Sequence, residues 1–243
     1  MAESGEVRTR ETTLDGVPVT YEVRRSDRAR RSRIDVDLRG VRVVVPAGAR
    51  VDPERLLAEH AEWVVDAQAR YEERREQVPA RRFEDGATFP FRGEPHEVVV
   101  ERRSKSVVDD SALRLARHHV EGTSVKRALE CLYRRKAREA FEREATRHAA
   151  RMGVEFERIE VRNQRTRWGS CSSKGTLSLN WRLVLGPPEV LEYVVVHELA
   201  HLVEPNHSDA FWAVLAAQLP DYADRRAWLR ENRLELVFDE GDL

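Results

Sequence analysis

Three histidines and a glutamate close together in the sequence are the residues best suited to chemistry. Three of them lie in the stretch His197-Glu198-Leu199-Ala200-His201, and His207 follows six residues after His201. On an α-helix, residues four apart share a face, so His197 and His201 can turn ring nitrogens toward one metal ion with Glu198 beside them. This is the H-E-x-x-H pattern of hydrolytic zinc sites. The pattern also arises by chance, so its context has to support it.

The surrounding sequence favours a metal site. The segment from Gly186 begins like a helix and continues apolar on almost every face, which predicts a buried helix. Buried imidazoles and carboxylates are costly unless they are paired or bind a metal. Pro205 should end the helix at Glu204 and turn the chain, which would bring His207 back. Catalytic zinc sites use three protein ligands and leave one position for water, the number reached with His207. Ordinary core histidines, or Glu204 as the third ligand, remain as alternatives.

These residues predict metal-assisted hydrolysis. Zinc on His197, His201 and His207 would make a water more acidic, and Glu198 would act as the general base. Such a site also needs an oxyanion donor, for which the candidates are Arg167, Tyr193 and Tyr222. Carboxylates that orient the imidazoles are expected as well, with Glu204 and Asp209 as candidates.

A second unusual stretch, Arg165-Thr166-Arg167-Trp168-Gly169-Ser170-Cys171-Ser172, precedes the metal helix. Together with the alternating Leu177, Leu179 and Trp181 of the expected return strand, it predicts a β-hairpin, and an extended peptide could add to its edge. We take Arg167, Trp168 and Asn180 as candidate substrate-binding residues, with packing in the hairpin core as the alternative for Trp168. Arginines near a metal could instead clamp phosphates. Cys171 is expected to be a small buried thiol and not a metal ligand.

The composition disfavours several classes of protein. The 243 residues are 41% hydrophobic, enough for one large domain or two small ones with a proper core. A net charge of -1 disfavours a general nucleic-acid binder. The polar segment 1–10 does not resemble a secretory signal, and no apolar run nears the roughly 20 residues that cross a bilayer, so we expect a cytoplasmic protein without a membrane partner. Cys131 and Cys171 are too few for a disulfide framework or a cysteine-based zinc site.

We predict an α+β fold in two domains. Residues 1–121 should form an N-terminal α/β region with a small antiparallel β part. Its strands are expected over 12–23, on either side of an Asp15-Gly16 turn, and in a hairpin over 34–45. A helix is expected over about 52–78 and a small antiparallel sheet over 83–116. His96, His118 and His119 are expected on the surface. The arginine-rich run of residues 24–33 is either a solvated loop or an anion site.

Residues 122–243 should form the metal domain, a zincin-like helical domain with a short β-hairpin. A long helix is expected between Gly122 and Gly153, capped by Thr123 or Ser124. After the metal helix, a helix capped by Ser208 should support the site from behind, and a last helix is expected over 221–233. The acidic end from Asp239 should be frayed.

The motifs occur together in an order that resembles a known family. They are the stretch Arg165 to Ser172, then Leu179-Asn180, Pro187-Pro188, Val196 to His201, Asn206-His207-Ser208 and Phe211-Trp212. The chain resembles the YgjP-like metallopeptidase family of the zincin group and, more distantly, SprT-like metalloproteases. The likeness is strongest over 161–212. It implies that the zinc ligands are His197, His201 and His207 and that the catalytic glutamate is Glu198.

A zinc-dependent metallopeptidase acting on a peptide or protein is therefore the favoured function. One alternative is a metal-dependent nucleoside triphosphate pyrophosphatase or other phosphoanhydride hydrolase, suggested by Arg162, Arg165 and Arg167. Another is a structural zinc protein without catalysis, which is disfavoured because it would leave Glu198 without a purpose. The sequence does not predict the oligomeric state.

Overall fold

The computed structural model describes residues 7–242 and divides into two compact units, with the division after Val78. Each unit has its own hydrophobic core. The mixture of helices and small sheets confirms the predicted α+β class. The domain boundary that the sequence predicts, between residues 121 and 122, falls inside the second unit, because the sheet that precedes it packs on the helix that follows it.

In the first unit, the chain begins with the predicted pair of strands. β1 (Val7–Leu14) and β2 (Val17–Ser26) pair antiparallel around a two-residue turn. Asp15 and Gly16 both have positive φ, 48° and 80°, as a tight hairpin of this type requires. The Asp-Gly signal therefore located the turn correctly.

The predicted hairpin over 34–45 is present as β3 (Arg33–Asp37) and β4 (Gly40–Pro46). The sheet is not purely antiparallel, however, because its order is β1-β2-β4-β3 and β2 pairs parallel with β4. After β2 the chain first forms the edge strand β3. The following hairpin turn then places β4 between β3 and β2. Local strand patterns carry no information about this non-local pairing.

The single helix predicted over 52–78 is two helices, α1 (Pro53–Ala58) and α2 (Ala61–Glu76). Between them, His60 has φ -125°, and its N–H donates to the carbonyl of Leu57, three residues back, at 3.0 Å. This turn is tighter than an α-helix allows. Leu57 and Val64 are both fully buried in the core of the first unit, one from each helix.

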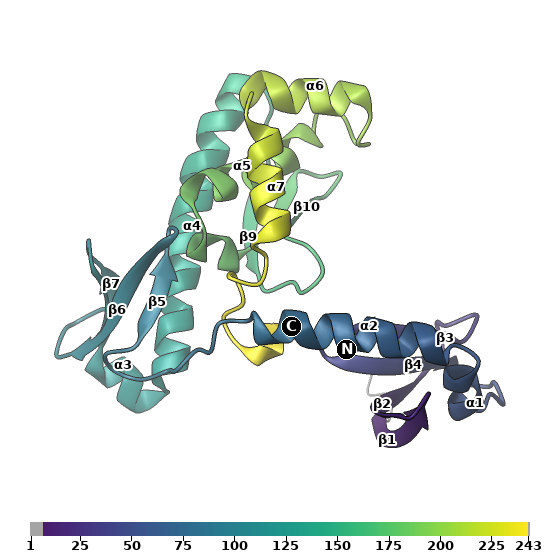
Figure 1. Ribbon diagram of the computed structural model, residues 1–243. Coiled ribbons are helices and arrows are strands. Elements are labelled where there is room, and N and C mark those ends of the chain that lie inside the picture. The colour runs from purple at the N-terminus through teal and green to yellow at the C-terminus, as the bar shows by residue number, and fades with distance from the viewer. Residues whose placement is uncertain (1–6, 243) are drawn as a thin grey trace. The chain divides into compact units, whose positions relative to one another are not determined.

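The second unit is built along one long helix (Figure 1). α4 (Val125–Met152) begins at Ser124, whose hydroxyl accepts from the N–H of Arg127 at 3.1 Å, and ends at Gly153 in the left-handed region, φ 67°. Both ends match the prediction, because a capping hydroxyl and a C-terminal glycine act locally. One face of α4 is apolar, and its residues Leu129, Leu132, Tyr133, Phe141 and Ala145 are buried.

Two sheets contact α4. The first has strands in the order β5-β6-β8-β7, namely β5 (Thr88–Phe91), β6 (Glu94–Glu101), β8 (Ala112–Ala116) and β7 (Val107–Val108). Helix α3 (Arg117–Gly122) follows it. The second sheet has the order β10-β11-β9, with β10 (Gly169–Cys171), β11 (Thr176–Asn180) and β9 (Arg158–Arg162). In each sheet one neighbouring pair is parallel, so the predicted antiparallel sheet over 83–116 is mixed.

Three sequence-based expectations are wrong in this unit. His96 is 7% exposed rather than on the surface, and its Nδ1 lies 3.0 Å from the carbonyl oxygen of Glu94. Trp181 does not extend the return strand but starts the 3-10 helix η1 (Trp181–Leu185), where it is buried. The acidic end is not frayed up to Asp242, because η2 (Glu240–Asp242) places that carboxylate in the core, where it accepts hydrogen bonds.

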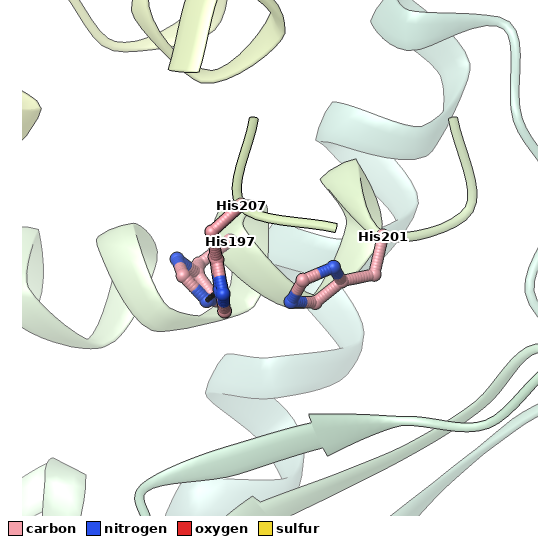
Figure 2. Close-up of side chains that lie close together, drawn as sticks. All are labelled: His197, His201 and His207. Atoms are coloured by element: carbon pink, nitrogen blue, oxygen red, sulfur yellow. Dashed lines mark hydrogen bonds between the residues drawn. The ribbon is translucent and has the colours of Figure 1, made fainter. Parts of the chain in front are cut away.

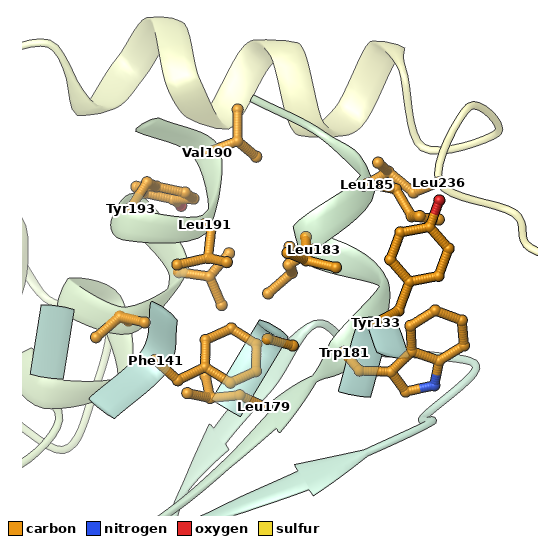
Figure 3. Close-up of a cluster of buried hydrophobic side chains, with 14 of the residues drawn as sticks. Tyr133, Phe141, Leu179, Trp181, Leu183, Leu185, Val190, Leu191, Tyr193 and Leu236 are labelled. Atoms are coloured by element: carbon orange, nitrogen blue, oxygen red, sulfur yellow. The ribbon is translucent and has the colours of Figure 1, made fainter. Parts of the chain in front are cut away.

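The core of the second unit joins α4 to the helix that carries the candidate metal ligands (Figure 3). Tyr133 of α4 stacks on Trp181 with ring centroids 6.0 Å apart, and Phe141 is fully buried nearby. From the other side α5 (Pro188–Ala200) contributes Leu191. α6 (Asp209–Gln218) and α7 (Tyr222–Glu231) complete the unit. No described helix is long and apolar enough to cross a membrane.

Candidate metal centre

Helix α5 carries the first two candidate ligands because its sequence makes it a buried helix. Pro188 occupies its first turn and Glu189 lies at the positive end of the helix dipole. Regular α-helix ends at Ala200, earlier than the predicted Glu204, but His201 keeps helical φ, -66°. His201 therefore still lies one turn from His197 on the same face.

After α5, the chain turns and returns the third candidate ligand. The N–H of Glu204 still donates to the carbonyl of Ala200 at 2.9 Å, and Pro205 follows, which cannot continue the helix. The next helix, α6, starts at Ser208, whose hydroxyl accepts from the N–H of Phe211 at 3.4 Å, as predicted. His207 lies directly before that cap.

The structure brings His197, His201 and His207 together, each offering a ring nitrogen within 4.8 Å of the others (Figure 2). The Nε2 atoms of His197 and His207 are 3.0 Å apart. Two nitrogens about 2.0–2.1 Å from a tetrahedral zinc ion lie roughly 3.3 to 3.4 Å apart, so this pair needs little movement to share one ion. Imidazole nitrogens are also suitable donors for zinc. The three residues therefore fit a metal site.

Aromatic rings support the three imidazoles. Phe211, fully buried, lies 4.9 Å from His197, 4.7 Å from His201 and 4.8 Å from His207, measured between ring centroids. Trp212 stacks on His207 at 5.8 Å with an interplanar angle of 24°. The predicted supporting role of α6 is thus fulfilled by its first turn.

The environment of His197 and His207 favours the neutral form of imidazole, which is the form that binds metal. Burial, followed by the nearby His201, His207 and Arg226, lowers the pKa of His197 to about 3. The pKa of His207 is lowered as well, by burial and then by His201 and Arg226. His201 Nδ1 lies 3.3 Å from the main-chain carbonyl of Glu204, so donation of its hydrogen there leaves Nε2 free for a metal.

Two of the expected orienting contacts differ from the prediction. The Glu204 carboxylate was the expected partner of an imidazole, but its main-chain oxygen takes that place. The side chain of Asp209 is exposed and makes no hydrogen bond to an imidazole within the described part of the chain. The buried Nδ1 of His197 has no hydrogen-bond partner among the described residues.

Glu198 lies in a tight position against strand β10. It is 5% exposed, and a Cβ added to Gly169 would lie only 2.4 Å from its Oε1 atom. The N–H of Cys171 donates to its carboxylate. Burial raises the pKa of Glu198 to about 7, although the charge of Arg167 and the Cys171 N–H act in the opposite direction. A buried carboxylate with a raised pKa is well suited to proton transfer.

The three candidate substrate-binding residues have different surroundings. Arg167 is exposed, and its charge acts on Glu198. Trp168 is partly buried, and the guanidinium carbon of Arg182 lies 5.3 Å from its ring centroid. Asn180 is fully buried: its side-chain NH2 donates to the carbonyl of Gln164 at 2.6 Å, and its oxygen accepts from the N–H of Arg182 at 3.1 Å. Asn180 therefore supports the loop from inside.

The remaining candidates lie at or near the imidazoles. Tyr193 is 6% exposed with its ring edge-on to His197 at 5.8 Å, and Tyr222 stacks on Trp212 at 5.6 Å. Burial and the charge of Glu198 raise the pKa of Cys171 to about 11, so its thiol stays protonated. Its sulfur is not part of the group of metal-suited atoms formed by the histidines.

Sequence reasoning missed two residues of this region. Gly169 belongs to the motif before the metal helix, but nothing in the motif indicates that it contacts Glu198. That contact depends on the packing of β10 against α5. Arg226 of α7 lies over Trp212, with its guanidinium carbon 4.9 Å from the ring centroid. No spacing rule connects position 226 with the histidines, so the sequence offered no signal.

A second group of metal-suited side chains lies between α4 and α5. It consists of Glu144, His148 and Glu192, called here the Glu144 group, and its ligand atoms also lie within 4.8 Å of one another. Arginines already bind both carboxylates: Arg143 donates to Glu144 at 2.9 Å and Arg225 donates to Glu192 at 2.6 Å. The group is therefore an ion-pair network that joins three helices.

Comparison with known proteins found two similar solved structures and one matching family model. Two solved structures are similar over 37% of the chain, each with a TM-score of 0.34. The zymogen of the metallopeptidase abylysin from Pyrococcus abyssi is 23% identical, with 93% of its own length covered. The zymogen of jannalysin from Methanocaldococcus jannaschii is 21% identical, with 88% of its own length covered.

No curated protein matches the chain. A family model described as "YgjP-like, metallopeptidase domain" matches residues 30–232. Because that model spans most of the sequence, the chain belongs to the YgjP-like metallopeptidase domain family and is a metallohydrolase.

Proposed function

We propose that the protein is a zinc-dependent peptidase in which His197, His201 and His207 bind the metal and Glu198 is the general base. The observation that supports it best is the convergence of three imidazoles with one buried carboxylate at the end of a buried helix. Three imidazoles suit zinc, and His207 is exposed, so substrate can reach the site from that side. Such an open side is typical of catalytic rather than structural zinc.

In this proposal the residues around the metal have separate roles. A bound zinc ion supplies Lewis acidity, which polarises the scissile carbonyl and makes water more acidic. Glu198 takes the proton from the attacking water and delivers it to the leaving amine. The Cys171 N–H and the crowding at Gly169 hold the carboxylate in one place while this happens. Tyr193 and Arg167 are the candidates to stabilise the oxyanion.

Strand β10 is the proposed docking edge for the peptide. In the sheet order β10-β11-β9, β10 pairs with β11 on one side only, so among the described strands its other edge is unpaired. Its Gly169 lies directly against Glu198. A peptide that adds to this edge would pass the carboxylate and gain main-chain hydrogen bonds. Arg167 and Trp168 lead into the strand and are the proposed side-chain contacts, with Asn180 supporting the loop beneath them.

The nucleotide alternative is less well supported, because the arginines that suggested it are dispersed. Arg162 donates to Glu160 at 3.1 Å and is thereby occupied, and the charge of Arg165 acts on the buried Arg182. Only Arg167 acts on Glu198. A triphosphate would need several cations converging on one place.

The decisive experiment combines metal analysis with an activity screen. Wild-type protein should carry about one zinc per chain and cleave members of a casein-like peptide pool. Glu198→Gln keeps the size of the side chain but cannot accept a proton, so metal should remain while peptide cleavage falls at least 10²-fold or so. Glu204→Gln is the matched control, since only the main chain of Glu204 contacts an imidazole, and it should keep both properties.

The same screen includes the four nucleoside triphosphates with detection of phosphate and pyrophosphate. Release of either product without any peptide cleavage, lost in Glu198→Gln, would assign the centre to a nucleotide hydrolase. Unchanged peptide cleavage by Glu198→Gln would mean that another group is the base.

A further inference from the structure

Arg226 and its neighbour Arg225 both lie on α7, but they differ in their ion-pair partners. Arg225 donates to Glu192 at 2.6 Å and to Asp221 at 3.0 Å, so its charge is used within the protein. Arg226 is exposed and forms no ion pair with a carboxylate anywhere in residues 7–242. An arginine without a carboxylate partner beside a candidate active site is available to a ligand.

The surroundings of Arg226 direct it toward the candidate metal site. Its guanidinium carbon lies 4.9 Å from the ring centroid of Trp212, and the same ring stacks on His207 at 5.8 Å. A guanidinium resting on an aromatic ring keeps its stacking while its N–H groups remain free to donate.

The charges around the site favour an anion at this position. Arg226 reaches the site from α7 by way of Trp212, whose ring stacks on His207, and Arg167 is exposed just before strand β10, which packs against α5. The carboxylates next to the imidazoles in the chain are Glu198, Glu204 and Asp209, and none of them pairs with Arg226 within residues 7–242. A metal ion would add further positive charge. A carboxylate matches the planar fork of a guanidinium and would offset this excess.

We propose that Arg226 binds a carboxylate of the peptide substrate and makes the enzyme prefer peptides that carry one near the cleaved bond. This inference rests on the peptidase function proposed above. The carboxylate can belong to an acidic side chain or to a free C-terminus, which present the same chemistry to a guanidinium. A neutral segment would gain nothing from Arg226.

The test uses one peptide that the wild-type protein cleaves, made in three versions. The first has one acidic side chain and an amidated C-terminus, the second has neutral side chains and a free C-terminus, and the third is neutral and amidated. Wild type should cleave at least one carboxylate version with a kcat/KM about 10-fold or more above that of the third, mainly through a lower KM. Whichever of the first two is favoured identifies the source of the carboxylate.

Substitutions at position 226 test whether the Arg226 side chain causes the preference for the carboxylate versions. Arg226→Gln should remove it, with a loss of roughly 10- to 150-fold on the favoured version and little change on the third. Arg226→Lys keeps the charge but not the planar fork of the guanidinium, so it should retain only part of the preference. Arg230→Gln is the control, because Arg230 lies one turn further along α7, 75% exposed, and pairs with Glu231.

Binding gives a readout that is independent of turnover. The Kd of labelled versions for the zinc-loaded Glu198→Gln protein should show the same order and should weaken when Arg226→Gln is added, with unchanged zinc content. Equal cleavage of all three versions by wild type, or equal loss on all three in Arg226→Gln, would overturn the inference and leave the peptidase function standing. Absence of cleavage of any peptide would overturn both.

Discussion

The three-histidine group and the Glu144 group hold similar numbers of metal-suited side chains in similar space, yet their surroundings differ. The first brings together three imidazoles that pack against Phe211, with no carboxylate among its three members. The second brings two carboxylates to His148, which is fully buried. In the second group guanidinium N–H groups occupy the carboxylate oxygens.

This difference shows that proximity of ligand-type residues is not sufficient for a metal site. A cation that entered the Glu144 group would have to displace charge-assisted hydrogen bonds from arginines, which are among the stronger contacts in a protein. It would also bring positive charge next to Arg143, Arg147 and Arg225. No guanidinium binds the three-histidine group in this way among the described residues, since Arg226 lies over the neighbouring Trp212 ring.

The largest expected effect separates the two groups by metal content. His197→Ala should weaken zinc binding by more than about 100-fold, because loss of an outer contact to a ligand already costs about 10- to 100-fold. His148→Ala should still bind about one zinc per chain. Metal analysis after dialysis and competition with a chelator measures both, with circular dichroism as the check on folding. Loss of zinc from His148→Ala with full zinc in His197→Ala would reverse the assignment.

The next effect concerns how the carboxylate is held in the three-histidine site. Gly169→Ala would place a methyl group 2.4 Å from the Glu198 Oε1 atom, so either the carboxylate or β10 has to move. A displacement of about 1 Å can cost 10²-fold in rate, and we expect about that loss in kcat with zinc retained. Gly122→Ala is the control, since nothing lies within 4 Å of its added Cβ. Wild-type turnover in Gly169→Ala would show that the position of Glu198 tolerates this shift.

The smallest effect tests the Glu144 group as a stabilising network. Glu192→Gln removes the charge that Arg225 and His148 contact and should lower the free energy of unfolding at pH 7 by about 2 kcal/mol. Glu142→Gln, which loses only an exposed contact with Arg138, should cost less than about 0.5 kcal/mol. Denaturant unfolding measures both values.

The loss of free energy of unfolding caused by Glu192→Gln should depend on pH in a defined direction. Burial alone would raise the pKa of Glu192, but hydrogen bonds from Arg225 and His148, with the charges of Arg225 and Arg147, outweigh burial and lower it. A carboxyl group whose pKa is lower in the folded state stabilises fully above its unfolded pKa, about 4.3, and loses that contribution as the pH falls through the folded value. The difference between wild type and Glu192→Gln should therefore be constant from pH 7 to about pH 5 and shrink below about pH 4. A difference that grows in acid would contradict this network.

The sequence predicted the features that depend on neighbouring residues. The spacing of His197 and His201 determines that they share a helix face, and Ser124 and Gly153 cap α4 through contacts within one turn. The Asp15-Gly16 turn follows from the same kind of local preference. Each of these depends on a few residues in a row, so pattern and residue type are enough to locate it.

Only the tertiary structure decided the features that join distant segments. It placed Arg226 over Trp212, Gly169 against Glu198 and Asp242 in the core, and it made the sheets mixed. The two groups of metal-suited residues illustrate the same limit, because the arginines that occupy Glu192 come from α4 and α7. Such contacts result from the packing of whole elements, and packing depends on the shape of many side chains at once rather than on any local pattern.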